Sequence, residues 1–197
     1  MTKEIEFLFD FGSPNAYLVH RAIEDMDNVG FRYVPVLLGG IFKAIGNQSP
    51  MQAYGHIAAK RDYDALEMRR FMAQHDINNF RMNPHFPVNT LLAMRGAVAA
   101  ESLGCAEDYT EAVFTAMWEQ GLKMDDPEVW ANAVAAAGLD AAALGAAAQD
   151  AQIKARLVAN TETAVARGVF GIPTFFLGEE MWFGKDRLRD VIEAATG

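Results

Sequence analysis

Ser13 stands where a strand pattern gives way to a helix pattern, a position at which a hydroxyl group could do chemistry. It follows the apolar, aromatic run Ile5–Phe11 and directly precedes Pro14. Serine at the N-cap followed by proline at the first helical position is a strong helix-start signal. The positive end of a helix favours an anion, to which the Ser13 hydroxyl could donate a hydrogen bond. The alternative is a plain helix cap, worth about 1 kcal/mol, and the two roles do not exclude each other.

Other residue types with chemical potential give weaker signals. Cys105 is the single cysteine, which excludes an intramolecular disulfide and a zinc site built from thiolates. Asp10 follows the first predicted strand and could orient a loop, but nothing in the sequence assigns it catalysis. No Gly-rich phosphate-binding pattern occurs, and we expect no metal site, because the four histidines lack ligand spacing: His20, His56, His75 and His85.

Composition restricts the partners and the compartment. The net charge is −9, whereas nucleic-acid binding normally requires a basic patch, so we expect no nucleic-acid partner. A single cysteine fits a reducing, cytoplasmic compartment. The N-terminus lacks the apolar core of a signal peptide, and the weakly apolar stretch 130–148 is alanine-rich and interrupted by Asp140. We therefore expect a cytoplasmic protein without membrane contact.

Regular elements on both sides position Ser13. The run Ile5–Phe11 predicts a buried strand, and apolar residues at helical spacing predict a helix from Pro14 to about Asp27. The apolar, β-branched segment Phe31–Leu38 predicts a second strand. A strand–helix–strand order gives a right-handed parallel crossover by default.

From Gly39 to about Arg167 the sequence predicts helices and no further strand. Apolar spacing and capping residues indicate helices at 64–75, 90–103, 107–120, 126–138 and 150–167, with a short one after Asp140. The β pattern then returns in Phe175–Leu177 and Met181–Phe183, which flank a Gly-containing turn and predict an antiparallel hairpin. A helix over 187–195 closes the chain.

This order of elements predicts an α/β fold interrupted by a large all-helical insertion. Together with Ile172-Pro173-Thr174 before the third strand, it resembles the thioredoxin fold, in which we expect Pro173 to be cis. The first part of the thioredoxin-like domain is placed at 1–39, the helical insertion at 40–160 and the second part at 161–197.

Four ordered motifs make the resemblance more specific. Along nearly the whole chain the sequence resembles the 2-hydroxychromene-2-carboxylate isomerases and the related kappa-class glutathione transferases, within a clan that includes DsbA-like oxidoreductases. The motifs are Phe9–Tyr17, Phe86–Thr90 with Ala93–Arg95 just after, Gly168–Phe175 and Phe183–Leu188.

Position 13 distinguishes the branches of this clan. A redox member needs Cys-x-x-Cys at the start of the first helix, whereas this chain has Ser13-Pro14-Asn15-Ala16, and Cys105 lies far away in sequence. Dithiol chemistry is thereby excluded. The resemblance implies that the anion is the thiolate of glutathione, and that Ser13 is the catalytic residue, donating its hydroxyl hydrogen to the sulfur.

The resemblance also implies residues that hold glutathione. The cysteinyl backbone would pair in a strand-like manner with Ile172 beside Pro173. The γ-glutamyl end would reach Lys185, which suits its carboxylate, and Asp186, which suits its ammonium group. For Asp186 the alternative is an acid that favours the dipole at the start of the last helix.

Two more residues are placed near the site by similarity alone. These are Asn47 and Lys60, of which Lys60 would suit a carboxylate. The alternative for Lys60 is a solvated position in the charged segment Lys60–Tyr63.

The family implies a glutathione-dependent isomerase of aromatic hydrocarbon catabolism. It would interconvert 2-hydroxychromene-2-carboxylate and trans-o-hydroxybenzylidenepyruvate, with a small aromatic carboxylate as substrate, and relatives suggest a homodimer. The motif Phe86–Thr90 favours the isomerase branch. The alternatives are a kappa-class-like glutathione S-transferase and a non-catalytic thioredoxin-like binding module.

Overall fold

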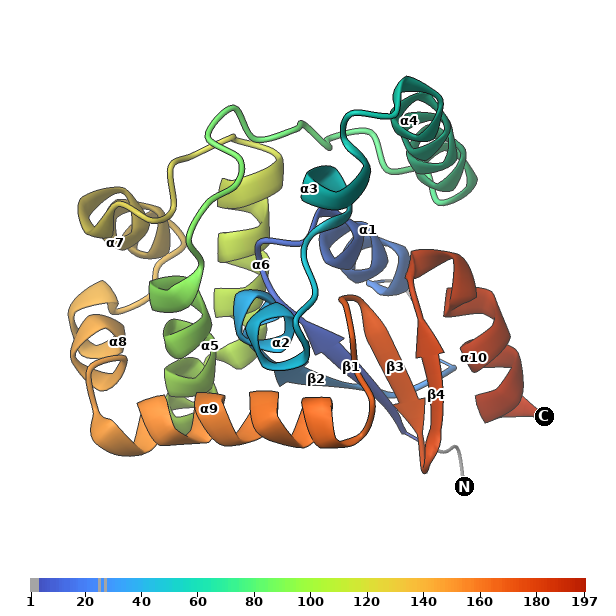
Figure 1. Cartoon of the computed structure of the whole chain (residues 1–197). Helices are drawn as coiled ribbons and strands as arrows, with labels where there is room; N and C mark the ends of the chain where they lie inside the picture. The colour runs from blue at the N-terminus through green and yellow to red at the C-terminus, as the bar shows by residue number, and fades with distance from the viewer. Residues whose placement is uncertain (1–3, 25, 27) are drawn as a thin grey trace.

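A four-stranded mixed sheet forms the base of the fold in the computed structural model, which describes residues 4–24, 26 and 28–197. Strand β2 runs parallel to β1, while β3 is antiparallel to both β1 and β4. This arrangement confirms the parallel crossover, the hairpin and the thioredoxin-like α/β class. Figure 1 shows the sheet, whose order is β2 (Phe31–Pro35), β1 (Ile5–Phe9), β3 (Thr174–Leu177) and β4 (Glu180–Phe183).

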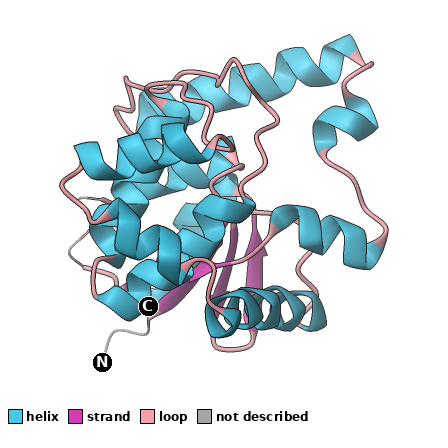
Figure 2. Cartoon of the chain, turned by 90° about the vertical axis from the view of Figure 1, so that its left-hand side faces the viewer, coloured by secondary structure: helices cyan, strands magenta, loops and turns pink. Residues whose placement is uncertain are grey.

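The regular elements between β2 and β3 are all helices, joined by loops; every residue of that segment is described, and it contains no strand. Figure 2 shows how much of the molecule they form around the small sheet. The proposed domain boundary at 160 falls inside α9. The helices are α1 (Pro14–Ile23), α2 (Leu38–Ile45), α3 (Pro50–Tyr54), α4 (Ala58–Gln74), α5 (Leu91–Leu103), α6 (Ala106–Trp118), α7 (Pro127–Ala136), α8 (Ala141–Ala147), α9 (Ala151–Ala166) and α10 (Leu188–Thr196), the last preceded by the 3₁₀ turn η1 (Lys185–Arg187).

Several predicted boundaries were wrong. Strand β1 ends at Phe9 rather than position 11, because the chain turns at Asp10. Helix α1 ends at Ile23 rather than near position 27, which itself lies outside the described residues. Strand β2 stops at Pro35, which has no N–H for a ladder, and not at Leu38, where α2 begins.

Two helices were missed, and one was predicted too short. Helix α2 opens with Leu38-Gly39-Gly40, and glycine lowers helix propensity. Helix α3 was missed although Ser49, Pro50 and Gln52 form a capping box with proline in the first turn, which is a readable start signal. Helix α4 begins at Ala58, earlier than predicted.

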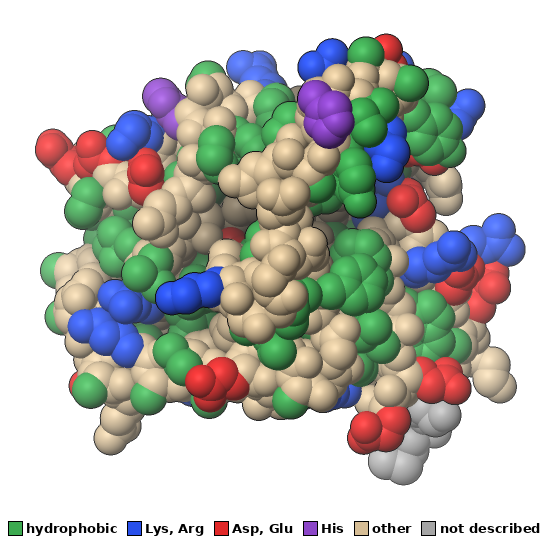
Figure 3. Space-filling view, in the orientation of Figure 1, with side chains coloured by type: hydrophobic (Ala, Val, Ile, Leu, Met, Phe, Trp, Pro, Cys, Tyr) green, Lys and Arg blue, Asp and Glu red, His purple; other side chains and the backbone are tan. Residues whose placement is uncertain are grey.

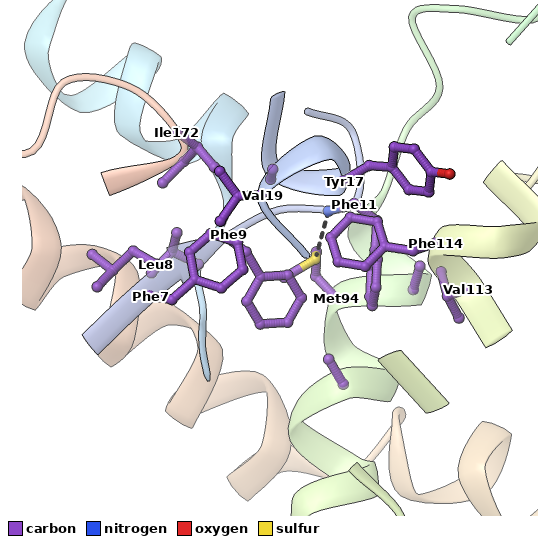
Figure 4. Packing of buried hydrophobic residues seen from close by; sticks show 14 of the residues in the cluster. Phe7, Leu8, Phe9, Phe11, Tyr17, Val19, Met94, Val113, Phe114 and Ile172 are labelled. Carbon is purple, nitrogen blue, oxygen red and sulfur yellow. Dashed lines mark hydrogen bonds between the residues drawn. The ribbon is translucent and has the colours of Figure 1, made fainter. Parts of the chain in front are cut away.

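Aromatic side chains of β1 and the following loop form the centre of the core. Phe7, Phe9 and Phe11 are at most 1% exposed, and the rings of Phe11 and Phe114 meet edge to face at 4.8 Å between centroids. Figure 4 shows this cluster between β1, α1 and the helices of the insertion. The β1–α1 connection is therefore fixed from the helical side as well as from the sheet.

A polar network ties α1 to β2 and α6 on one side of this core. His20 contacts the Tyr33 hydroxyl at 2.8 Å through Nδ1 and Glu111 at 3.0 Å through Nε2. Arg21 donates to both carboxylate oxygens of Glu111, at 2.7 and 2.8 Å, and also to Glu119. The hydrogen bond from His20 and those from Arg21 hold the pKa of Glu111 far below its ordinary 4.5, against a smaller opposing effect of burial.

The depressed pKa of Glu111 predicts acid sensitivity of the fold. The folded state binds the proton of Glu111 less tightly than the unfolded chain, so its stabilising contribution is present above about pH 4.5 and is lost as pH falls below that value. Since the side chain is 43% exposed, we expect Glu111→Gln to lower the free energy of unfolding by only about 1–2 kcal/mol at neutral pH. Urea unfolding at several pH values between neutral and acidic measures this free energy for both proteins. The difference between Glu111→Gln and wild type should become smaller in acid.

Glu162→Gln is the matched control, because it removes the same charge from an exposed position on α9. The side chain of Glu162 makes no hydrogen bond or ion pair with any residue of the described part of the chain. A Glu111→Gln variant as stable as the control at neutral pH would contradict the prediction.

Candidate active site

Ser13 lies at the N-terminus of α1 and faces the loop that precedes β3. Its Oγ accepts a hydrogen bond from Ala16 N at 3.2 Å, which confirms the predicted cap, with Pro14 at the first helical position. The same hydroxyl donates to the carbonyl of Ile172 at 3.1 Å, and Ser13 is only 4% exposed. The Ile172–Pro173 peptide bond is cis, as predicted. The fold thus brings Ser13 next to Ile172, which lies 159 positions further along the chain, and next to the adjoining Pro173.

The loop before β3 presents main-chain polar groups next to Ser13. Gly184 N donates to Pro173 O at 2.9 Å, which ties the loop to the end of β4. The amide of Ile172 donates no hydrogen bond to any atom of the described residues, while its carbonyl accepts the hydroxyl of Ser13. A strand-like ligand segment could therefore pair with Ile172 in this loop.

Two half-exposed aromatic rings border this loop. Phe170 and Phe183 are 41% and 42% exposed, and their ring centroids lie 4.4 Å apart. A Cβ atom at Gly171 would lie 2.6 Å from the Phe183 ring, so the backbone passes this ring at a distance that requires glycine. Together the two rings form an apolar edge beside the cis-proline loop.

Helices of the insertion hold the loop that carries Ser13. The Phe11 amide contacts the sulfur of Met94 on α5 at 3.4 Å, the interaction dashed in Figure 4. The indole N–H of Trp118 on α6 donates to the Phe11 carbonyl at 2.8 Å. Asp10, which the sequence suggested could orient a loop, accepts from Gly12 N at 2.8 Å. The insertion therefore fixes the position of Ser13.

Lys185 and Asp186 lie on the 3₁₀ turn η1. This turn directly precedes α10, so the two residues are not in the α-helix itself. Lys185 is 5% exposed, and its Nζ donates to Asp186 and lies 5.2 Å from the centroid of the Phe71 ring. A hollow of about 220 Å³ adjoins this pair, and its lining combines cationic side chains with the carboxylates of Glu67 and Asp186, a mixture suited to a ligand end that carries both charges. The lining residues are Glu67, Arg70, Phe71, Gln74, His75, Lys185, Asp186, Leu188 and Arg189.

Asn47 and Lys60 differ in their contact with the segment that leads into the cis-proline loop. Asn47 Nδ2 donates to the Phe170 carbonyl at 3.2 Å, so Asn47 touches the segment that leads into the cis-proline loop. Lys60 is exposed, its Nζ lies 3.6 Å from the centroid of the Tyr54 ring, and no contact joins it to Ser13, Ile172 or Lys185 among the described residues. Figure 3 shows Lys and Arg side chains beside hydrophobic ones on this face, over α3 and the start of α4.

A second hollow, of about 540 Å³, contains none of the predicted site residues. It lies beyond the C-terminal end of α1, where the polar network of His20, Tyr33 and Glu111 forms part of its wall. These polar groups are paired with one another and tie α1 to β2 and α6.

Sequence reasoning missed the helical wall of the Lys185 hollow and the partners of Asp10. The wall comes from Arg70, Gln74 and His75 on α4, where burial lowers the pKa of His75. The partners of Asp10 are Leu38 and Thr90, both distant in sequence. Thr90 stands in a motif that the sequence did single out, but nothing in the sequence indicates its contact with Asp10.

The described residues offer neither a metal-binding cluster nor a membrane-spanning helix. Within residues 4–24, 26 and 28–197, no three His, Cys, Asp or Glu side chains lie close enough to hold a metal ion. In that same part of the chain, no helix has the length and hydropathy needed to cross a membrane.

Comparisons with a family model and with known proteins place the chain in the same family. A model of the DSBA-like thioredoxin domain matches residues 4–195. The chain is 32% identical to a 2-hydroxychromene-2-carboxylate isomerase of Pseudomonas sp. (strain C18), over 98% of this chain and 90% of that protein. It is 30% identical to a protein of the same name from Pseudomonas putida, over 98% and 94% of the two chains.

Solved structures agree with the sequence comparisons. A structure of 2-hydroxychromene-2-carboxylate isomerase aligns with a TM-score of 0.82 and 28% identity, over 97% of this chain and 93% of that one. Pseudomonas aeruginosa DsbA aligns with a TM-score of 0.60 at 20% identity, over 96% and 80% of the chains, which is similarity of fold alone.

Proposed function

The chain belongs to the DSBA-like thioredoxin domain family and, within it, to the 2-hydroxychromene-2-carboxylate isomerase family, and on that basis we propose that it is an isomerase that depends on glutathione. Its substrate is 2-hydroxychromene-2-carboxylate or a similar aromatic carboxylate, which it interconverts with trans-o-hydroxybenzylidenepyruvate. The observation that carries the proposal is the contact of Ser13 with Ile172 at the cis-proline loop.

The residues around Ser13 fit the tripeptide thiol. Ile172 offers an amide without a partner among the described residues and a carbonyl bonded to a hydroxyl that can rotate. A peptide main chain that pairs with both groups of Ile172 would take over its carbonyl and release the Ser13 hydroxyl. Lys185 and the adjoining hollow suit the α-carboxylate at the γ-glutamyl end, and Asp186 suits its ammonium group.

The roles of the protein groups follow from this fit. When bound, glutathione supplies a nucleophilic sulfur whose reversible addition turns a substrate double bond into a single bond. Ser13 donates its hydroxyl hydrogen to the sulfur, and the N-terminus of α1 favours the negative charge. The apolar edge of Phe170 and Phe183 borders the cis-proline loop, where an aromatic substrate would lie close to Ser13.

The test is an assay of 2-hydroxychromene-2-carboxylate conversion with and without glutathione. We expect turnover with glutathione, and none with S-methylglutathione, which keeps the peptide groups but lacks the thiol. Equal turnover without any thiol would contradict the glutathione dependence.

A parallel assay distinguishes the alternatives. Conjugation of glutathione to a chloronitrobenzene, faster than isomerisation, would indicate a kappa-class-like transferase. Failure of glutathione to bind in calorimetry or to raise the melting temperature would indicate a non-catalytic binding module.

A further inference from the structure

The buried carboxylate of Asp10 joins three segments next to the proposed site, although the proposed chemistry does not use it. Asp10 is 2% exposed. Its Oδ1 accepts from Gly12 N at 2.8 Å and from the Thr90 hydroxyl at 2.7 Å, and its Oδ2 accepts from Leu38 N at 2.8 Å. Burial raises the pKa of the Asp10 carboxyl above its ordinary 3.8, and the three hydrogen bonds oppose that rise. One side chain thus holds the Ser13 loop, the start of α5 and the start of α2.

Thr90 is committed to this contact rather than to its own helix. It occupies the N-cap position of α5, where a threonine hydroxyl normally accepts from a helix amide, yet its side chain makes no capping hydrogen bond. Asn89 performs that task instead, since its Oδ1 accepts from Leu91 N at 3.0 Å. The hydroxyl of Thr90 is therefore available to donate to Asp10.

The packing around this contact leaves little freedom for the Ser13 loop. A Cβ atom at Gly12 would lie 3.3 Å from both Asp10 Oδ1 and Thr90 Cγ2. The backbone amide of Ser13 itself donates to the Asp10 carbonyl at 3.0 Å. The side chain of Asp10 therefore holds Gly12, and the main-chain carbonyl of Asp10 holds Ser13.

Helix α2 extends this tie to the other side of the site. Leu38 is its first residue, and Asn47, just beyond its end, donates to Phe170 O at 3.2 Å. Phe170 lies two residues before Ile172, whose carbonyl accepts the hydroxyl of Ser13. Hydrogen bonds and one helix thus form a closed ring that runs from Asp10 through α2 to the cis-proline loop and back through Ser13.

We propose that Asp10 and Thr90 are positioning residues, which hold Ser13 and Ile172 at the separation that activation of the bound thiol requires. This inference rests on the proposed function. It predicts that loosening the ring impairs the chemical step more than it impairs glutathione binding, because small displacements of a catalytic donor lower rates steeply.

Thr90→Val tests the inference, since valine keeps the shape of threonine, and the variant leaves the charge of Asp10 in place. We expect kcat to fall about tenfold, with KM for glutathione changed less than about twofold. The ultraviolet absorbance of the thiolate of bound glutathione should titrate at higher pH than in wild type. Thr90→Ser, which restores a hydroxyl, should recover most of kcat.

Thr110→Val is the control, because Thr110 is a buried threonine on α6 whose hydroxyl donates to Ala106 O of its own helix at 2.7 Å. It should leave kcat and the thiolate titration unchanged. An unaltered kcat in Thr90→Val, or an equal loss in Thr110→Val, would overturn the positioning role.

Amide hydrogen exchange provides a measurement that does not involve glutathione. The amides of Gly12 and Leu38 should exchange faster in Thr90→Val than in wild type or Thr110→Val, and unchanged exchange would refute the ring. A wild-type protein that shows protected amides but no glutathione-dependent turnover would instead refute the proposed function.

Discussion

Replacing Ser13 with alanine is expected to lower kcat of the glutathione-dependent reaction by about 100-fold near neutral pH. The variant removes the hydroxyl that now donates to Ile172 O and that we assign to the sulfur. Without this donor the pKa of the bound thiol rises toward the ordinary value of about 8.5. Because the thiolate fraction falls when the pKa exceeds the pH, the loss should be largest at low pH and should narrow in alkaline solution. Profiles of kcat against pH for both proteins measure the effect.

Loss of the helix cap needs a separate control, since Ser13→Ala also removes about 1 kcal/mol of capping. Asp126→Ala is matched to it, because Asp126 caps α7 with Pro127 at the first helical position, as Ser13 does for α1. Both variants should lose similar stability in urea, while Asp126→Ala retains full kcat. A Ser13→Ala profile that overlays the wild type at every pH would remove Ser13 from the mechanism.

Replacing Lys185 with methionine is expected to weaken glutathione binding by about 10- to 100-fold, as loss of a charge-assisted hydrogen bond predicts. Methionine keeps the apolar stem that packs near Phe71, and it leaves no buried charge unpaired, because the side chain of Asp186 is 64% exposed. At saturating glutathione kcat should change little, because Lys185 does not contact Ser13. Titration calorimetry with glutathione measures the change in Kd.

Lys123→Met provides the comparison for this variant. Lys123 forms a short-range pair with Asp125 at 3.2 Å, but its side chain is 52% exposed, far above the 6% of Lys185. The control should bind glutathione like wild type. If Lys185→Met also binds with unchanged Kd, the γ-glutamyl end lies elsewhere.

Local signals in the sequence predicted much of the fold. Ser13-Pro14 and Asp126-Pro127 start helices at the predicted residues, because caps and N1 prolines act within one turn. Helix α2 was not predicted, because Gly39 and Gly40 lower its local helix propensity. Its start is fixed by hydrogen bonds to Asp10 and Thr161, which belong to other parts of the chain. Such tertiary hydrogen bonds leave no local pattern.

The candidate site likewise contains residues that the sequence could predict and residues that only the tertiary packing places there. Ser13 and Pro173 stand in motifs that could be recognised, and the structure brings the Ser13 hydroxyl to the cis-proline loop. The wall formed by Arg70 and Gln74 depends on where α4 packs against η1, which no spacing along the chain determines. Lys60, placed by similarity alone, lies over Tyr54 without contact to Ser13 in the described part of the chain.

A crystal structure of the protein with glutathione bound would test most directly whether a bound thiol replaces the missing redox cysteine. It should show the sulfur within hydrogen-bonding distance of Ser13 Oγ, with the cysteinyl main chain paired to Ile172 and the hydroxyl no longer bonded to the Ile172 carbonyl. Glutathione bound with its sulfur away from the N-terminus of α1, and Ser13 still bonded to Ile172, would contradict it.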